Sequence, residues 1–114
     1  MITRQEFDKG AAAVRANLMA TLPRMVRYKS HIQTGIIDIA SRKELEDVRD
    51  SRLNQGMIDK LARLCKKAMD GARDAESVYC GAMAVGTIIK EYDWGDSYLT
   101  PDGLYDLAIR ILDA

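Results

Sequence analysis

An uncharged run of thirteen residues, Ser77 to Ile89, constrains the fold of this chain more than any other part of its sequence. Its apolar and small residues fall on two helical seams, with Val78, Ala82, Val85 and Ile89 on one and Tyr79, Met83 and Gly86 on the other. A helix that is apolar on nearly every side is stable only when other elements surround it. The run therefore predicts a central helix near residues 75–91, with a pair of short buried strands as the alternative.

The first forty residues have apolar spacing typical of two further helices. Thr3 and Glu6 have the spacing of a capping box, which starts the first helix. The buried face of this helix contains Phe7, Ala11, Val14 and Leu18. We expect it to end near Leu22, because Pro23 disfavours helical geometry in the residue before it. A second stripe follows at helical steps and contains Met25, Tyr28, Ile32, Ile36 and Ile39.

A short charged helix is predicted after this stripe. Ser41 and Glu44 repeat the capping-box spacing and open a helix that points Leu45 and Val48 inward. An Asn-Gln-Gly sequence is expected to end it, because Gly56 suits the left-handed conformation that follows a helix. Most other residues of this segment are charged, so the helix is expected on the outside of the molecule.

Two more helices complete the prediction. The first is amphipathic, with Ile58, Leu61, Leu64, Cys65, Ala68 and Ala72 opposite Asp59, Lys60, Arg63, Lys66 and Lys67. It either breaks at Asp70 and Gly71 or continues into the central helix. The last begins at Thr100 and Pro101, an N-cap followed by proline at the first helical position. We therefore predict one all-α domain over residues 1–114, a bundle or orthogonal array of five to six helices.

The charges of the chain are balanced in number but separated along the sequence. Residues 1–67 contain fourteen Lys/Arg and eight Asp/Glu, a net charge of +6, whereas residues 68–114 contain three and nine, a net charge of −6. Two interpretations are open. The two segments lie side by side and neutralise each other, or the molecule has one basic and one acidic face that steer a partner.

The cysteines and the charge-free runs bear on the compartment. Cys65 and Cys80 lie in apolar helical patterns and have neither metal-ligand spacing nor a disulfide framework, so we expect free buried thiols in a reducing cytosol. Glu6 and Asp8 stand near the start with no long apolar core after them, which argues against a signal peptide. The longest charge-free runs fall short of the roughly 20 residues of a membrane span. We expect a cytoplasmic protein without a membrane partner.

Residues for catalysis are few. His31 is the one histidine, which leaves the common zinc sites and a Ser-His-Asp triad unsupported. The chain has no glycine-rich phosphate loop, which excludes a P-loop or dinucleotide fold, and its loop acids lack the EF-hand spacing. We therefore predict no catalytic residues, metal or cofactor.

Two acidic pairs are the basis of an enzyme hypothesis. Glu44 and Asp47 are three residues apart, and Asp70 and Asp74 are four apart, so each pair shares one face of a helix. Two such pairs on adjacent helices suit Mg²⁺ and a nucleotide phosphate. In this respect the chain is loosely similar to the all-α nucleoside triphosphate pyrophosphohydrolases, whose glutamate-rich first motif has no counterpart here. The resemblance implies a magnesium-dependent nucleotide hydrolase.

Two other segments are candidate binding surfaces. The loop before the last helix contains Tyr92, Asp93, Trp94, Asp96 and Tyr98. Its aromatic residues either cover the open end of the bundle or contact a partner, because Trp and Tyr often carry binding energy at interfaces. The basic segment contributes Arg15, Arg24, Arg27 and Lys29, which either form an ordinary solvated face or bind phosphates and stacked bases.

Three functions follow from these features, in order of preference. The first is a small non-enzymatic binding protein, a regulator, inhibitor or accessory factor that contacts another protein or a second copy of itself. Phages and mobile elements carry proteins of this kind, although no residue points to that origin. The second is a nucleic-acid-binding helical module that uses the basic residues of the 9–37 segment. The third is the magnesium-dependent hydrolase.

Overall fold

The predicted central helix is present and is enclosed by the other helices. A computed structural model describes residues 2–16, 18–40, 43–44, 46, 54–92 and 94–114, with the backbone alone for residues 18–26. Helix α5 (Ala75–Glu91) contacts each of the four other long helices. The seam of Val78, Ala82, Val85 and Ile89 is fully buried. The absence of charge from this run is explained by the burial of ten of its thirteen residues, while Ser77, Met83 and Thr87 are half-buried.

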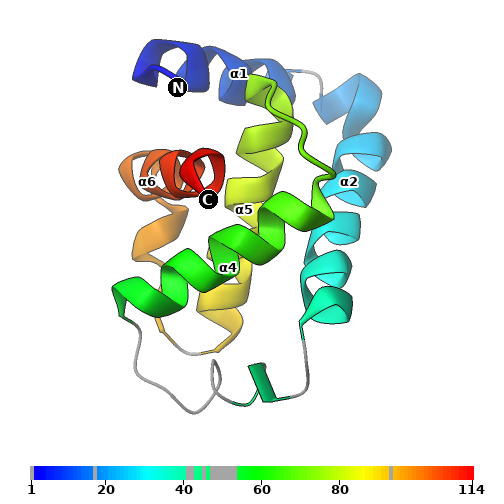
Figure 1. Ribbon diagram of the computed structural model, residues 1–114. Coiled ribbons are helices and arrows are strands. Elements are labelled where there is room, and N and C mark those ends of the chain that lie inside the picture. Colours follow the sequence, from blue (N-terminus) through cyan, green and yellow to red (C-terminus); the bar gives the residue numbers. More distant parts are fainter. Residues whose placement is uncertain (1, 17, 41–42, 45, 47–53, 93) are drawn as a thin grey trace.

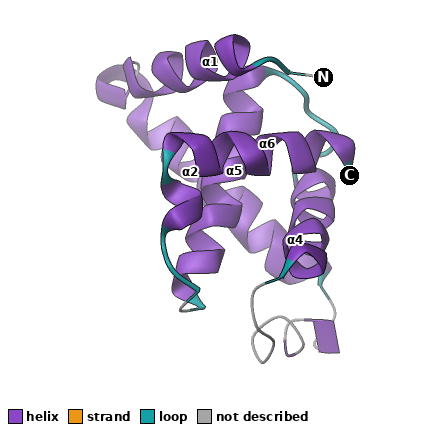
Figure 2. Cartoon of the chain, turned by 90° about the vertical axis from the view of Figure 1, so that its left-hand side faces the viewer, coloured by secondary structure: helices purple, strands orange, loops and turns teal. Residues whose placement is uncertain are grey.

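The helices around α5 cross one another steeply. They are α1 (Arg4–Ala16), α2 (Leu18–Ile39), α4 (Gln55–Ala68) and α6 (Pro101–Asp113). In Figure 1, α1 lies across the top of α5, α2 and α6 lie on opposite sides of it, and α4 crosses in front. Figure 2 shows α1 and α6 with nearly parallel axes but opposite chain directions, so that the N-terminus and the C-terminus lie on the same side of the molecule. The described residues contain no strand, which confirms an all-α orthogonal array and removes the alternative of two buried strands.

Local capping signals place the starts of α1 and α6. The Thr3 hydroxyl accepts a hydrogen bond from the Glu6 amide at 3.1 Å, and a Glu6 carboxylate oxygen accepts one from the Thr3 amide at 3.2 Å. These reciprocal bonds form the predicted capping box. The Thr100 hydroxyl likewise accepts from the Gly103 amide at 3.1 Å, with Pro101 as the first residue of α6. A short 3₁₀ turn, η1 (Ser97–Leu99), leads into that cap.

Two predicted helix ends are wrong. Helix α1 ends at Ala16, and Pro23 lies inside α2 instead of closing the first helix. A proline there removes one backbone hydrogen bond of α2. The burial of Ile32 and Ile36 in the core favours α2 as a helix of its own despite this loss. Gly56 does not end a helix either. It is the second residue of α4, because the Asn54 side chain accepts from the Met57 amide at 3.0 Å and caps α4.

The turn between α4 and α5 lies at Asp70 and Gly71, where the sequence predicted either a break or a continuation. Asp70 and Gly71 have φ of 56° and 77°, and the Gly71 amide donates to the Lys66 carbonyl at 3.3 Å. Two consecutive left-handed residues end α4, which settles the question whether it continues into the central helix. Of the helix predicted from Ser41, the described residues 43–44 and 46 are helical, whereas Ser41, Leu45 and Val48 lie outside the described residues.

A close helix crossing explains the glycine in α2. A Cβ atom placed on Gly35 would lie 2.9 Å from the Cβ of Ala68 in α4. Contacts that short do not occur between real methyl groups, so the two helices approach as closely as they do only because residue 35 has no side chain. A glycine inside a helix costs about 1 kcal/mol relative to alanine. The close packing of α2 against α4 offsets this cost.

One continuous core fills the space between the helices. Its members include Phe7 of α1, Ile36 of α2, Leu61 of α4 and Leu107 of α6, each 1% exposed or less. The Phe7 ring contacts the rings of Tyr79 and Tyr105 at centroid distances of 5.8 and 5.5 Å. The radius of gyration is 13.2 Å, close to the roughly 13 Å of a compact globule of this length.

Candidate functional site

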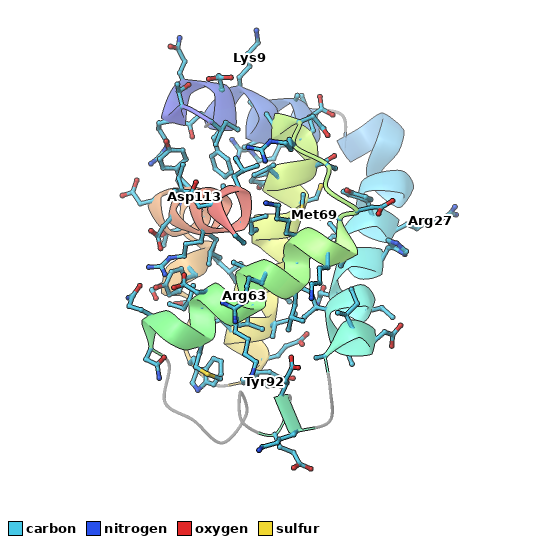
Figure 3. All side chains as sticks on the ribbon, in the orientation of Figure 1. Lys9, Arg27, Arg63, Met69, Tyr92 and Asp113 are labelled. Carbon is cyan, nitrogen blue, oxygen red and sulfur yellow. The ribbon has the colours of Figure 1, made fainter. Side chains whose placement is uncertain are left out.

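The aromatic loop after α5 both covers the core and remains partly exposed. The rings of Tyr92 and Trp94 meet edge to face, with centroids 5.6 Å apart, and both side chains pack against the core. Their amides donate to the carbonyls of Ile88 and Ile89, each at 3.1 Å, so the backbone that carries the rings is held to α5. Figure 3 shows Tyr92 at the lower end of α5. Each ring is half-buried, which leaves part of it available to a partner.

The other loop residues divide between packing and solvent. Tyr98 is half-buried against the core, and the neighbouring Leu99 lies over Gly86 of α5. Asp96 is exposed, and Asp93 lies outside the described residues. The loop therefore closes one end of the core, as the structural interpretation of the sequence predicted, while a contact role for Tyr92 and Trp94 stays a prediction.

The predicted basic residues are spread over two helices. Arg15 is exposed near the end of α1, Arg27 is exposed on α2, and Lys29 is half-buried. The side chain of Arg24 lies outside the described part. Figure 3 shows Lys9 pointing away from α1 and Arg27 pointing outward from α2, toward different sides of the molecule.

Two of the ion pairs among the described residues join the basic segment to the acidic segment, and one of these, Arg4 with Asp102, places a basic-segment cation against an acidic-segment carboxylate. The guanidinium of Arg4 lies 2.9 Å from carboxylate oxygens of both Asp8 and Asp102. Arg110 pairs with Asp106 at 3.0 Å and with Asp59 of α4 at 2.9 Å. Burial lowers the pKa of Arg110, but the bonds to the two carboxylates outweigh burial and raise this pKa above its usual value. The charges thus neutralise each other in part within the fold.

The acidic pair at Asp70 and Asp74 does not share a helix face. Asp70 lies in the left-handed turn after α4, whereas Asp74 is the N-cap of α5 and accepts from the Ser77 amide at 3.1 Å. The turn between them breaks the spacing on which the magnesium hypothesis depends. Asp47 lies outside the described residues. No group of three potential metal ligands occurs in the part of the chain that the structure describes.

The outer side of α4 has a cationic surface that the sequence analysis did not select. We call Lys60, Arg63 and Lys67 the α4 cations. Together with Leu64 and Glu44 they line a hollow of about 230 Å³. Within the described residues none of the three α4 cations forms an ion pair. Figure 3 shows Arg63 on the outer side of α4.

A second hollow adjoins the first at Arg63. It has a volume of about 380 Å³ and lies between α4 and α6, lined by Asp59, Arg63, Arg110, Asp113 and Ala114. Asp59 stands four residues before Arg63, the spacing of a helical ion pair. In the structure it binds Arg110 instead. Arg63 is the residue that the two hollows share, and it keeps its charge without a described counter-ion.

The single histidine and the two thiols offer little chemistry. His31 is exposed on α2. Cys65 and Cys80 form no disulfide and are buried, as predicted. Burial raises the pKa of Cys65 to about 12 and that of Cys80 to about 11. A thiol with such a pKa is almost entirely protonated at neutral pH, so neither is a nucleophile in the folded protein.

Comparisons with protein-family models, curated proteins and solved structures found no match for this chain. Among the described residues no helix has both the length and the apolar character needed to cross a bilayer. The residues that sequence reasoning passed over are the α4 cations. Their signal was present as lysines and arginines on the polar face of α4, but the contact between Asp59 and Arg110, which leaves Arg63 without a counter-ion among the described residues, depends on the tertiary fold.

Proposed function

We propose that this protein is a small non-enzymatic binding protein, a regulator, inhibitor or accessory factor that contacts another protein chain or a second copy of itself. The observation that carries the proposal is the half-exposed pair of Tyr92 and Trp94 at the end of α5. Aromatic residues dominate binding energy at protein interfaces. Because the backbone of this pair is bonded to α5, little conformational freedom is lost when a partner binds.

A cytoplasmic location accompanies this proposal. The support is that Cys65 and Cys80 form no disulfide, and reduced thiols persist in reducing compartments. Tyr92 and Trp94 pack against the core, and each also keeps a partly exposed surface.

The test is affinity capture with the intact chain from the cells that produce it, combined with light scattering of the purified protein. Trp94→Ala is the interface variant, and Lys90→Ala is the control because Lys90 is an exposed neighbour at the end of α5. We expect a stoichiometric protein partner or a defined oligomer that the control retains and Trp94→Ala loses. A monomer that captures nothing, or capture that is equal for both variants, contradicts the proposal.

Nucleic-acid binding is the second candidate function. Arg15 and Arg27 are exposed and form no ion pair with a described residue, which favours this alternative. Binding through such residues weakens steeply with salt, by about one unit of log–log slope for each phosphate contacted. A gel shift at low salt that disappears in an Arg15→Gln, Arg27→Gln double variant supports this function, and the absence of any shift removes it.

A further inference from the structure

The α4 cations are arranged in a way that no ion pair among the described residues uses. Lys60, Arg63 and Lys67 are separated by three and four residues, so they are neighbours on one side of α4. Like charges at this spacing repel one another and destabilise a helix slightly. Near the end of the helix Lys67 is favoured by the helix dipole, but Lys60 and Arg63 lie too far from that end to benefit. No carboxylate among the described residues pairs with any of the three.

Arg63 is the centre of this arrangement. It lines both hollows, one of about 230 Å³ and one of about 380 Å³, so a ligand in either lies beside its guanidinium. The nearest carboxylate along the helix, Asp59, is held by Arg110 at 2.9 Å, and Arg110 is held in turn by Asp106 at 3.0 Å. A planar guanidinium with free donors matches a carboxylate through two parallel hydrogen bonds.

The rim of the hollows distinguishes between classes of anion. Glu44 lies on one side of the α4 cations, and Asp59 and Asp113 lie on the other. A nucleic-acid strand has a phosphate at every nucleotide and would bring negative charge against these carboxylates as well as against the cations. A protein surface presents separate carboxylates, with its own cations or neutral residues between them. The mixed charge of the rim therefore favours an acidic protein segment over a nucleic acid.

We infer that the partner of this chain is a protein whose acidic segment lies along the outer side of α4, with one carboxylate bound to Arg63 and others near Lys60 and Lys67. This inference rests on the proposed protein-binding function and adds the chemistry of the partner. The surface is distinct from the aromatic loop, so a partner that uses both contacts the protein at two places.

The test uses a hexaglutamate peptide as the probe and the intact, isotopically labelled chain at low salt. Backbone amide shifts of α4 are followed by NMR during titration. Arg63→Gln is the main variant, and Arg27→Gln is the matched control because it removes the same charge from an exposed position on α2. We expect shifts concentrated at residues 60–67 and affinity that falls about tenfold or more in Arg63→Gln, since a bond between charged groups contributes about 1.5–3 kcal/mol. The control stays within about twofold of the parent protein.

Four other outcomes overturn the inference. Tighter binding of a twelve-residue oligothymidine to the same residues assigns the surface to nucleic acid. Equal loss of affinity in Arg63→Gln and Arg27→Gln shows that the peptide responds only to overall charge. Shifts at residues 60–67 that depend on protein concentration without peptide assign the surface to a second copy. Capture of the natural partner by a chain in which all three α4 cations are Gln retains the proposed function and removes only this inference.

Discussion

Helices α5 and α4 are neighbours in sequence and contact each other, yet α5 is mostly buried whereas α4 has one charged side that faces outward. In α5 ten residues are buried, from Val78 to Ile89, and the helix contacts each of the four other long helices. In α4 five residues are buried, and the α4 cations face outward without described counter-ions. The comparison shows that packing accounts for the composition of α5, whereas the outer side of α4 carries charges that packing does not require.

The largest expected effect comes from shortening a buried side chain of α5. Ile89 is completely buried, so Ile89→Ala removes three carbon atoms from the core and leaves a cavity. The free energy of unfolding should fall by about 2–5 kcal/mol. Arg63→Gln on α4 should change it by no more than about 0.5 kcal/mol. Urea denaturation of both variants measures the difference, and similar losses would show that α4 is as dependent on its surface charges as α5 is on its core.

A smaller effect is expected where α2 crosses α4. Gly35→Ala places a methyl group 2.9 Å from that of Ala68, and overpacking of this kind costs about 1–3 kcal/mol. In the double variant Gly35→Ala, Ala68→Gly the nearest atom is the Ala68 Cα at 3.6 Å, an ordinary contact. The gain and loss of helix propensity cancel, so stability should return to within about 1 kcal/mol of the parent. Failure of the second change to rescue the first contradicts the described crossing.

The smallest effect concerns pH, because α5 has a titratable cap and α4 does not. Burial raises the pKa of Asp74, but the side-chain and backbone hydrogen bonds from Ser77 outweigh burial and hold this pKa below its usual value. A carboxyl group whose pKa is lower in the folded state stabilises the fold above its unfolded pKa, and this contribution is lost as the pH falls through the folded pKa.

The variant Asp74→Asn keeps a capping oxygen and cannot titrate. Its stability should therefore decline less between neutral and acidic pH than that of the parent chain, in denaturation series run at matched pH values. Asn54→Asp is the reciprocal change on α4, since Asn54 caps that helix through the Met57 amide. This change should make the free energy of unfolding fall more steeply between neutral and acidic pH. If the parent chain and the Asp74→Asn variant have the same pH dependence, the ionised carboxylate of Asp74 does not stabilise the fold.

Local patterns predicted much of this fold. The capping box at Thr3, the proline start of α6 and the central α5 depend on residues close in sequence, and each is present. The errors at Pro23 and Gly56 arise where distant packing or a competing cap outweighs a local preference. The candidate surfaces were harder to predict for the same reason.

The clearest example is Arg63. Sequence spacing suggests Asp59 as its partner, but Asp59 binds Arg110, which is 51 residues away in sequence. Only the crossing of α4 and α6 decides which arginine is neutralised. The half-buried aromatic loop likewise combines both interpretations that the sequence left open, because Trp94 contributes to the core and to the surface at once.

Amide hydrogen exchange of the chain, alone and with its captured partner, tests the central claim most directly. In the free protein we expect the amides of α5 to exchange most slowly, because they belong to the enclosed core. Addition of the partner should slow exchange at residues 60–67 of α4 and leave the interior of α5 unchanged. Slower exchange elsewhere on the molecule, with residues 60–67 unaffected, would contradict the assignment of α5 to the fold and of the α4 cations to a partner.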